Sequence, residues 1–348
     1  MKASKRIIAI LEILIIMFSI VSSYNNIQVN AKVIPFRQKP VKIAVFLHDF
    51  KDKYISLVHE SFEEIQKNNQ DKVEFVFYDG QNDQSIQNNS IDSVLENEDS
   101  NLIFLNLVDT KVTSEAINKI KAKNIPVILF NREPVDINAV KSYNKAFFVG
   151  TDSKEAGILQ GKILINAWNS NKSIDRNNDD IMQYVMLMGE KDNTEAIDRT
   201  KYSVSTINSA GIKTQEIALR ICGWNRDVAE NIMESVFAIN GNRIEAVISN
   251  NDEMAIGAIE ALQKYGYNKD DKTMYIPVVG VDAIPEARKL VDEGIMTGTV
   301  IQDPKVMAKV IYDMGMNLVY ERKPLDGIQY DFDQTGVAVR LPYGEYTG

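Results

Sequence analysis

The stretch DRNNDDIMQ begins like a calcium-binding loop but does not end like one. Asp175, Asn177 and Asp179 occupy the first, third and fifth places of the EF-hand pattern, which arranges oxygen ligands around a hard cation. Asp180 stands at the sixth place, where the pattern has Gly because the chain turns sharply, and Asp tolerates the left-handed conformation. Met186 stands at the twelfth place instead of Glu. Three interpretations remain open: a broken loop, a turn rich in Asp and Asn, or a metal site whose last ligand comes from elsewhere in the chain.

A second group of polar side chains follows the apolar runs of the sequence and has the hydrogen-bonding capacity to hold a polar ligand. Its members are His48, Asp52, Asn106, Asn131, the segment from Glu190 to Arg199, Trp224, Asn251, Asp282 and Gln302. Asn and Asp also cap helix N-termini, so capping is the alternative role for those residues. Glycoside hydrolysis would use a carboxylate pair such as Asp52 with Asp282 or Glu195, but nothing in the sequence marks either as the acid of raised pKa that this reaction needs.

The composition is that of a soluble globular protein long enough for two domains, with 348 residues of which 45% are hydrophobic and 25% charged. The chain has two histidines, His48 and His59, and one cysteine, Cys222. Two histidines are too few for most histidine-based metal sites and leave few possibilities for a nucleophilic triad, and a single cysteine cannot form an intrachain disulfide.

The N-terminus is predicted to be a secretory signal. Three basic residues precede the apolar run 7–21, which is short for a membrane span and is interrupted by Glu12. Cleavage is predicted after Ala31, which removes three basic residues and one acidic residue and changes the net charge from −9 to −11. No cysteine ends the apolar run, where a bacterial lipoprotein would carry its lipid. The acidity argues against a nucleic-acid partner, and the signal stands where a repressor would have its helix-turn-helix.

Past residue 40, short apolar runs alternate with amphipathic stretches of helical length. Buried strands are predicted at 41–48, 73–79, 101–108 and 125–131, because these runs are rich in Val, Ile and Phe. Between them, apolar residues recur at helical spacing. This alternation predicts a parallel sheet with helices on both faces.

The same alternation restarts after a strand at 145–150 and a helix at 153–168. Further strands are predicted at 182–189, 214–221, 245–250, 276–282 and 297–303. The predicted fold class is therefore α/β, with two doubly wound parallel-sheet domains joined by short crossings. Loops at the carboxyl ends of both sheets face a cleft in such a fold, which is where the polar residues after each strand are expected to gather.

Several segments resemble the periplasmic galactose/glucose-binding proteins of sugar ABC transporters, which belong to the type I periplasmic binding proteins. They are YDGQNDQSIQNNSID, NLVD, FNREPVD, SYNKAFFVGTDSKEAG, SNNDEMAIGAIEAL, VVGVDAIPEA and GTVIQD, and the resemblance runs from about residue 40 to the end. GTDSKEAG and GVDAIPEA recur in more distant sugar-binding relatives, whereas DRNNDDIMQ narrows the resemblance to the galactose/glucose branch. The resemblance implies two lobes joined by a three-segment hinge, with 40–125 plus 302–337 in the N-terminal lobe and 126–301 plus 338–348 in the C-terminal lobe.

The resemblance also implies an answer for the calcium-like loop. The family's loop matches the first nine positions of an EF-hand and takes its final bidentate carboxylate from a distant strand. The implied ligands of a structural Ca²⁺ are Asp175, Asn177, Asp179, the Ile181 carbonyl, Gln183 and Glu245. About seven oxygens result if Glu245 is bidentate, a number that suits calcium better than magnesium.

A hexopyranose has weakly apolar faces and a rim of hydroxyls, so it is held between aromatic rings by charged and amide side chains. Tyr54 and Trp224 stand at the family's two stacking positions, and the alternative is that both rings belong to the core. The family's polar contacts are matched in kind by Asp52, Asn106, Arg199, Asn251 and Asp282. Four positions depart, because His48 replaces a Tyr, Asn193 a His, Glu195 an Asp and Gln302 an Asn. These changes predict an altered preference among galactose, glucose and their glycosides.

The resemblance implies a sugar-binding protein without enzymatic activity. Hinge closure would capture galactose, glucose or a methylgalactoside, and the closed form would be recognised by an ABC transporter permease. The alternative is a membrane-anchored extracellular sensor that reports sugar to a membrane kinase or chemoreceptor. We expect a monomer that is exported to the periplasm or to the outer face of the cytoplasmic membrane.

Overall fold

The computed structural model describes residues 39–269, 271 and 273–348, and residues 40–348 form one unit. The first of its two sheets has six strands in the order β11-β5-β4-β3-β1-β2, and every pair is parallel. The strands are β1 (Val41–Leu47), β2 (Val73–Asp79), β3 (Leu102–Leu105), β4 (Val127–Phe130), β5 (Ala146–Thr151) and β11 (Ala338–Leu341). These are the apolar runs expected of a sheet covered on both faces.

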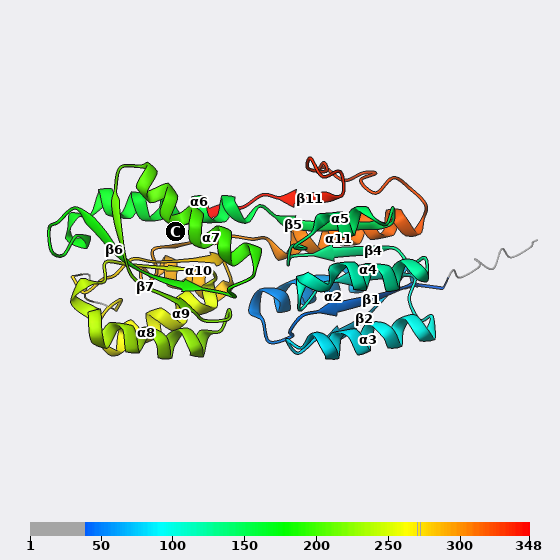
Figure 1. Ribbon diagram of the computed structural model, residues 1–348, viewed down its shortest axis with the longest axis horizontal. Coiled ribbons are helices and arrows are strands. Elements are labelled where there is room, and N and C mark those ends of the chain that lie inside the picture. The colour runs from blue at the N-terminus through cyan, green and yellow to red at the C-terminus, as the bar shows by residue number, and fades with distance from the viewer. Residues whose placement is uncertain (1–38, 270, 272) are drawn as a thin grey trace, which may run out of the picture. The chain divides into compact units, whose positions relative to one another are not determined.

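Helices cover both faces of this sheet (Figure 1). Helices α2 (Lys53–Asn68) and α11 (Pro304–Val319) pack on one face, and α3 (Gln84–Asn97), α4 (Thr113–Ala122) and α5 (Ile137–Lys141) pack on the other. Each buries an apolar stripe, as Ile55, Val58 and Phe62 of α2 illustrate.

The second sheet repeats the plan in the order β12-β10-β9-β8-β6-β7. Its strands are β6 (Ile181–Met188), β7 (Lys213–Ile221), β8 (Ala246–Ser249), β9 (Val278–Asp282), β10 (Gly298–Ile301) and β12 (Gly344–Tyr346). All its pairs are parallel except β10 with β12, which is antiparallel. Helices α6 (Ser153–Ser170) and α7 (Thr194–Ser209) cover one face, and α8 (Arg226–Asn240), α9 (Asp252–Lys264) and α10 (Pro285–Asp292) cover the other. The two-sheet α/β prediction is confirmed.

The lobe boundaries differ from those implied by the resemblance. Strands β4, β5 and β11 belong to the first sheet, so residues 127–151 and 338–341 lie in the N-terminal lobe. The sequence pattern could not assign them, because strands of both sheets have the same apolar character and only pairing decides membership. The chain therefore crosses between the sheets after Thr151, after Ile301 and after Leu341.

The predicted signal, residues 1–31, lies outside the described residues. Within the described part of the chain, no helix has both the length and the apolar character needed to cross a membrane.

Candidate functional site

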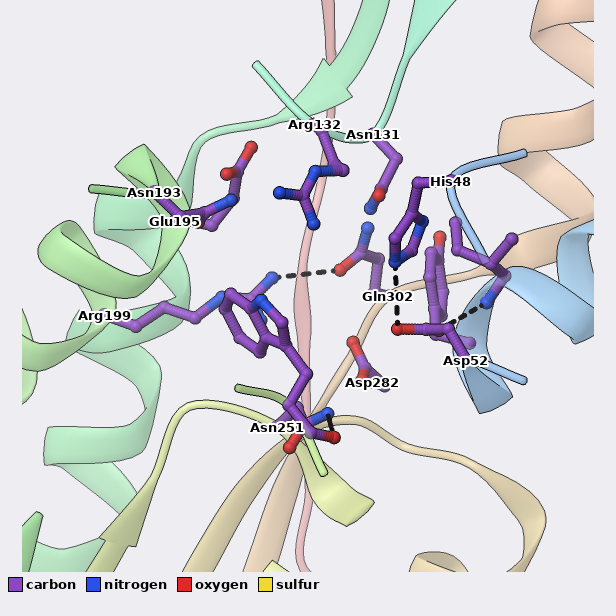
Figure 2. A pocket seen from close by; sticks show the side chains of 13 residues that line it. His48, Asp52, Asn131, Arg132, Asn193, Glu195, Arg199, Asn251, Asp282 and Gln302 are labelled. Atoms are coloured by element: carbon purple, nitrogen blue, oxygen red, sulfur yellow. Dashed lines mark hydrogen bonds and ion pairs between the residues drawn. The ribbon is translucent and has the colours of Figure 1, made fainter. Parts of the chain in front are cut away.

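A pocket is lined by side chains at or just past the ends of β1, β4, β6, β7, β8, β9 and β10, so both sheets contribute to it (Figure 2). Its lining residues are His48, Asp52, Tyr54, Ile55, Asn131, Arg132, Asn193, Glu195, Arg199, Trp224, Asn251, Asp282 and Gln302. This is the carboxyl edge at which open parallel sheets bind their ligands.

Three of these residues both cap a helix and line the pocket. The side chain of Asp52 accepts from the backbone N–H of Ile55, that of Asn193 from Ala196, and that of Asn251 from Met254. Capping fixes each side chain at the start of its helix, α2, α7 or α9. The capping alternative is thus correct for these three, and it does not exclude a second role in the pocket.

Two further carboxyl groups, those of Glu195 and Asp282, line the pocket, and burial raises the pKa of both. Glu195 Oε1 accepts the backbone N–H of Glu133 at 2.8 Å, and burial raises the pKa of Glu195 in spite of that bond. Burial, and next to it the charges of Asp252 and Asp52, raise the pKa of Asp282 well above its usual range, although the charge of Arg199 opposes them. Asp282 has a φ of 114°, a strained value for a residue with a side chain, and such strain is concentrated at functional sites.

Two guanidinium groups oppose these carboxyls. Arg199 donates to the carbonyl of Asn250 at 2.8 Å, to Gln302 Oε1 at 3.2 Å and to the hydroxyl of Tyr343 at 3.0 Å. Arg132 pairs with Glu190 through both of its terminal nitrogens, at 2.5 and 3.3 Å. With these partners, the pocket combines buried positive and negative groups and suits an uncharged polar ligand better than an ion.

The hydrogen bonds of Asn106 determine which ring nitrogen of His48 carries the proton. Asn106 Nδ2 donates to the carbonyl of Phe130, so Oδ1 is the atom that receives both the backbone N–H and Nδ1 of His48, the latter at 2.7 Å. Nδ1 must therefore hold the proton. Burial, and then the charge of Arg132, lower the pKa of His48, so the ring is neutral near pH 7. His48 Nε2 is consequently an acceptor, and it lies 3.8 Å from the second acceptor Asp52 Oδ2. A ligand hydroxyl between them has one proton, which it would donate to one of the two acceptors or share between them.

The hydrogen bond from Arg199 likewise determines the orientation of the Gln302 amide. Arg199 can only donate, so the atom that faces it at 3.2 Å must be Oε1, and Nε2 is left as a donor (Figure 2). Four buried polar atoms of the pocket have no hydrogen-bond partner in the described part of the chain: Gln302 Nε2, Arg132 Nε, Arg199 Nε and Glu195 Oε2. Unsatisfied buried groups cost about 1–3 kcal/mol each, so their concentration here indicates a polar ligand.

The two aromatic residues of the pocket are positioned by close contacts with neighbouring residues. Tyr54 is buried at the start of α2, and its hydroxyl lies 3.5 Å from Met307 Sδ. Trp224 is half-buried with a φ of 64°, and a Cβ added to Gly189 would come within 2.3 Å of its ring. Any side chain at position 189 would therefore displace this ring from the pocket wall.

The predicted calcium loop has a preorganised backbone. Asp180 has a φ of 56°, as expected for the sixth place of the pattern. Glu245 accepts the backbone N–H groups of Arg176 at 2.7 Å and Gln183 at 3.0 Å, so the distant carboxylate does lie against the loop. Gln183 is 2% exposed, and its Oε1 has no partner within the described residues. An unsatisfied oxygen beside carboxylates fits a cation ligand.

The carboxylates of this loop are not arranged as a ready-made metal site. No three His, Cys, Asp or Glu side chains within residues 39–269, 271 and 273–348 converge as a metal cluster. Asp179 Oδ2 instead accepts from Gln183 Nε2 at 2.9 Å and from Asn177 Nδ2 at 2.8 Å. Burial, and next the charges of Asp175 and Asp179, raise the pKa of Glu245, which is the repulsion that a divalent cation would relieve. The residues fit calcium in kind, and calcium binding stays a prediction.

Comparison with known proteins identifies the family. The model of the periplasmic binding protein domain matches residues 43–323. The chain belongs to the periplasmic binding protein family. It is 33% identical over 303 residues to the D-galactose/methyl-galactoside binding periplasmic protein MglB of Haemophilus influenzae, covering 87% of this chain and 88% of that protein. It is also 29% identical over 270 residues to a putative rhizopine-binding protein of Rhizobium meliloti, covering 77% of this chain and 81% of the other.

Solved structures of periplasmic binding proteins share the fold. An ABC transporter solute binding protein from Bacillus halodurans with bound myo-inositol has a TM-score of 0.73 and 24% identity, covering 89% of this chain and 95% of that one. A periplasmic solute binding protein from Actinobacillus succinogenes with bound D-allose also has a TM-score of 0.73, with 19% identity and coverage of 88% and 97%. Family membership places this chain among substrate-binding proteins rather than among enzymes.

Within this family fold, the structure brings together all but one of the eleven residues predicted to contact a sugar. The exception is Asn106, which is fully buried and orients His48 without lining the pocket. Asn131 lines it instead, one strand further along the sheet, together with Ile55 and Arg132. Asn131 is among the polar residues that the sequence places directly after a strand, whereas the resemblance implied Asn106 as the contact. That these residues bind a sugar stays a prediction.

Proposed function

We propose that this protein is the extracytoplasmic binding component of a sugar ABC transporter, and that it holds a neutral monosaccharide of the galactose/glucose class in the pocket between its sheets. The main support is the set of four unsatisfied buried atoms, three donors and one acceptor, in a pocket that also presents carboxylates and two aromatic rings. This combination is complementary to a polyhydroxylated ring. The resemblance to a galactose/methyl-galactoside binding protein favours that sugar class.

Galactose and glucose differ at one carbinol centre, so discrimination depends on where single acceptors and donors lie. In this pocket His48 Nε2 only accepts and Gln302 Nε2 only donates. Relatives described as binding myo-inositol and D-allose indicate that other polyhydroxylated rings belong in the test panel.

We propose further that the loop from Asp175 to Gln183, with Glu245, binds a structural Ca²⁺. The support is the unsatisfied Gln183 Oε1, the contact of Glu245 with the loop and the left-handed Asp180. When bound, the ion would link the loop electrostatically to Glu245, the residue that precedes β8. The ligands would be those predicted from the sequence.

Sugar-driven closure of the hinge would present the protein to a permease, and a chemoreceptor or membrane kinase is the alternative recipient of the same closed form. Recognition by one partner or the other would be tested by crosslinking the sugar-loaded protein in membranes that carry a candidate permease or sensor.

Isothermal titration with galactose, glucose, methyl-galactoside, allose and myo-inositol tests the binding function. Each titration is run with calcium and after chelation. We expect a Kd in the micromolar range for at least one of the first three. Tight binding of allose or inositol alone would reassign the sugar class, and no binding in the whole panel would contradict the proposal.

A further inference from the structure

Three crossings connect the two sheets: 151–153 between β5 and α6, 301–304 between β10 and α11, and 341–344 between β11 and β12. We call them the hinge crossings. Any movement of one lobe relative to the other must change backbone dihedral angles in these segments. Side chains that join the crossings to one another are therefore placed to influence that movement.

Tyr343 joins two of the hinge crossings. Its hydroxyl lies 2.7 Å from Thr151 Oγ1 on the first crossing, while Tyr343 itself stands on the third. Both residues are buried, with exposed fractions of 8% for Tyr343 and 7% for Thr151. The Tyr343 oxygen also accepts from Arg199 at 3.0 Å, so its proton is available to Thr151.

Arg199 connects this pair to the remaining crossing and to the pocket. The nitrogen that donates to Tyr343 also donates to Gln302, on the second crossing. Arg199 and Gln302 are 4% and 1% exposed, and both line the pocket. One guanidinium thus contacts two crossings directly and reaches the third through a single hydroxyl.

We propose that Tyr343, which does not line the pocket, is a positioning residue for ligand binding, because it holds the Arg199 guanidinium on the hinge crossings and so couples pocket occupancy to lobe closure. Within this buried network a hydrogen bond to a charged group is strong and directional. A ligand that engages Arg199 therefore acts on all three crossings. The role in ligand binding rests on the proposed function, whereas the role at the hinge does not.

The substitution Tyr343→Phe keeps the ring and removes the hydroxyl. Tyr143→Phe is the matched control, because Tyr143 is buried in the first lobe and its hydroxyl makes one bond, to the Ile125 carbonyl at 3.1 Å. We expect Tyr343→Phe to raise the Kd for sugar by roughly tenfold and Tyr143→Phe to leave it unchanged, since only the first loses a bond to a charged pocket residue. Similar melting temperatures for the two variants would separate this effect from a general loss of stability.

A double-mutant cycle adds a readout that a merely structural role would not produce. Thr151→Val removes the other partner of the Tyr343 hydroxyl, at a residue that does not line the pocket. If the two residues act through one network, the losses in affinity of Tyr343→Phe and Thr151→Val are not additive in the double variant. Additive losses would contradict coupling through the shared hydroxyl.

Hydrogen exchange of the ligand-free protein tests the hinge role even if no sugar binds. We expect faster amide exchange at the three hinge crossings in Tyr343→Phe than in Tyr143→Phe. Absence of sugar binding by the unsubstituted protein would overturn the proposed function alone, whereas unchanged exchange at the crossings would overturn the hinge role. Sugar binding by the unsubstituted protein with equal Kd values for Tyr343→Phe and Tyr143→Phe would overturn the role in binding.

Discussion

His48 shows how the chemistry of one side chain is decided by a neighbour that does not touch the pocket. Asn106 fixes the proton on Nδ1, and burial keeps the ring neutral. The nitrogen that faces the pocket, Nε2, therefore only accepts hydrogen bonds, whereas in a charged histidine it would donate. At this position the sequence comparison implied a Tyr, which can donate as well as accept. The replacement therefore changes the hydrogen-bonding pattern that a ligand meets.

This argument predicts a pH dependence. The pKa of His48 in the folded protein is lowered from the usual 6.5, so the neutral ring persists somewhat below that pH and is lost as pH falls further. Protonation turns Nε2 into a donor, so sugar affinity should fall as the pH is lowered past the usual histidine pKa of 6.5 and further into the acidic range. Stability should decline in the same direction, because the unfolded chain takes up the proton at a higher pH than the folded one.

Titrations at pH 8, 7, 6 and 5 measure this dependence. His48→Gln removes the ionising group, and we expect a flatter affinity profile in that variant. His59→Gln is the matched control, since His59 also has a pKa lowered mainly by burial but contacts Phe77 of β2 and does not line the pocket. A profile as steep in His48→Gln as in the unsubstituted protein would assign the dependence to the carboxyl groups.

Asn106 and Asn131 also show where prediction from sequence ends at this scale. Both follow a buried strand, so the sequence placed both at the correct edge of the sheet. Only the structure reveals that Asn106 uses its amide on Phe130, Asn131 and His48, which leaves Asn131 to line the pocket. The path of each loop, including the left-handed φ of 61° at Asn131, decides this and has no local sequence signature.

At the scale of elements, the strands and most helices could be predicted because their periodicity is strong. The expected runs at 41–48, 73–79 and 182–189 coincide with β1, β2 and β6 to within a residue or two. The assignment of β5 and β11 to a lobe could not be predicted, because hydrogen bonding between distant strands decides it. The antiparallel pairing of β12 with β10 could not be predicted either, because the pattern of apolar residues carries no information on strand direction.

The calcium loop gives a prediction at this scale. Removing calcium by chelation should lower the melting temperature, because an ion present at about a hundred times its Kd stabilises the folded state by about 2.7 kcal/mol. Asp179→Asn should weaken calcium binding, since it removes one of the predicted charged ligands. Calorimetric titration with calcium and thermal melts with and without chelator measure both effects.

Asp180→Asn is the control for that loop. It removes the same charge one residue away, at a place that the pattern does not use as a ligand, and Asn tolerates its φ of 56°. Equal weakening in both variants would indicate attraction by net charge rather than coordination. A melting temperature insensitive to chelation in the unsubstituted protein would contradict the structural ion.

At the scale of the whole molecule, contacts between residues far apart in sequence connect the loops of the two lobes. Arg132 follows β4 of the first sheet and Glu190 follows β6 of the second, and they form a bidentate ion pair. The backbone N–H of Glu133 donates to Glu195 across the same boundary. No local pattern predicts such pairs, because neither partner has a distinctive sequence context.

This pair leads to a prediction about closure. Arg132 is 8% exposed, so Glu190→Gln leaves a nearly buried guanidinium without its charged partner, and the cost falls on the conformation in which the two lobes meet. We expect the variant to shift the equilibrium toward the open form, raising the Kd for sugar by about three- to tenfold, chiefly through faster dissociation. Stopped-flow kinetics and the sugar-induced decrease in radius of gyration by small-angle scattering measure the two effects.

Glu286→Gln is the matched control for this ion pair. Glu286 also pairs with an arginine through both of its carboxylate oxygens, at 2.9 and 3.0 Å, but its partner Arg226 lies in the same lobe. Because Arg226 also keeps a bidentate pair with Glu260, the loss of Glu286 should lower stability only slightly and should not change the dissociation rate of the sugar. If the two variants changed that rate equally, the effect of Glu190→Gln would reflect a general loss of stability and not a loss of lobe closure. Closure would then depend on the ligand and the hinge crossings, so the affinity of Tyr343→Phe, rather than that of Glu190→Gln, would report it.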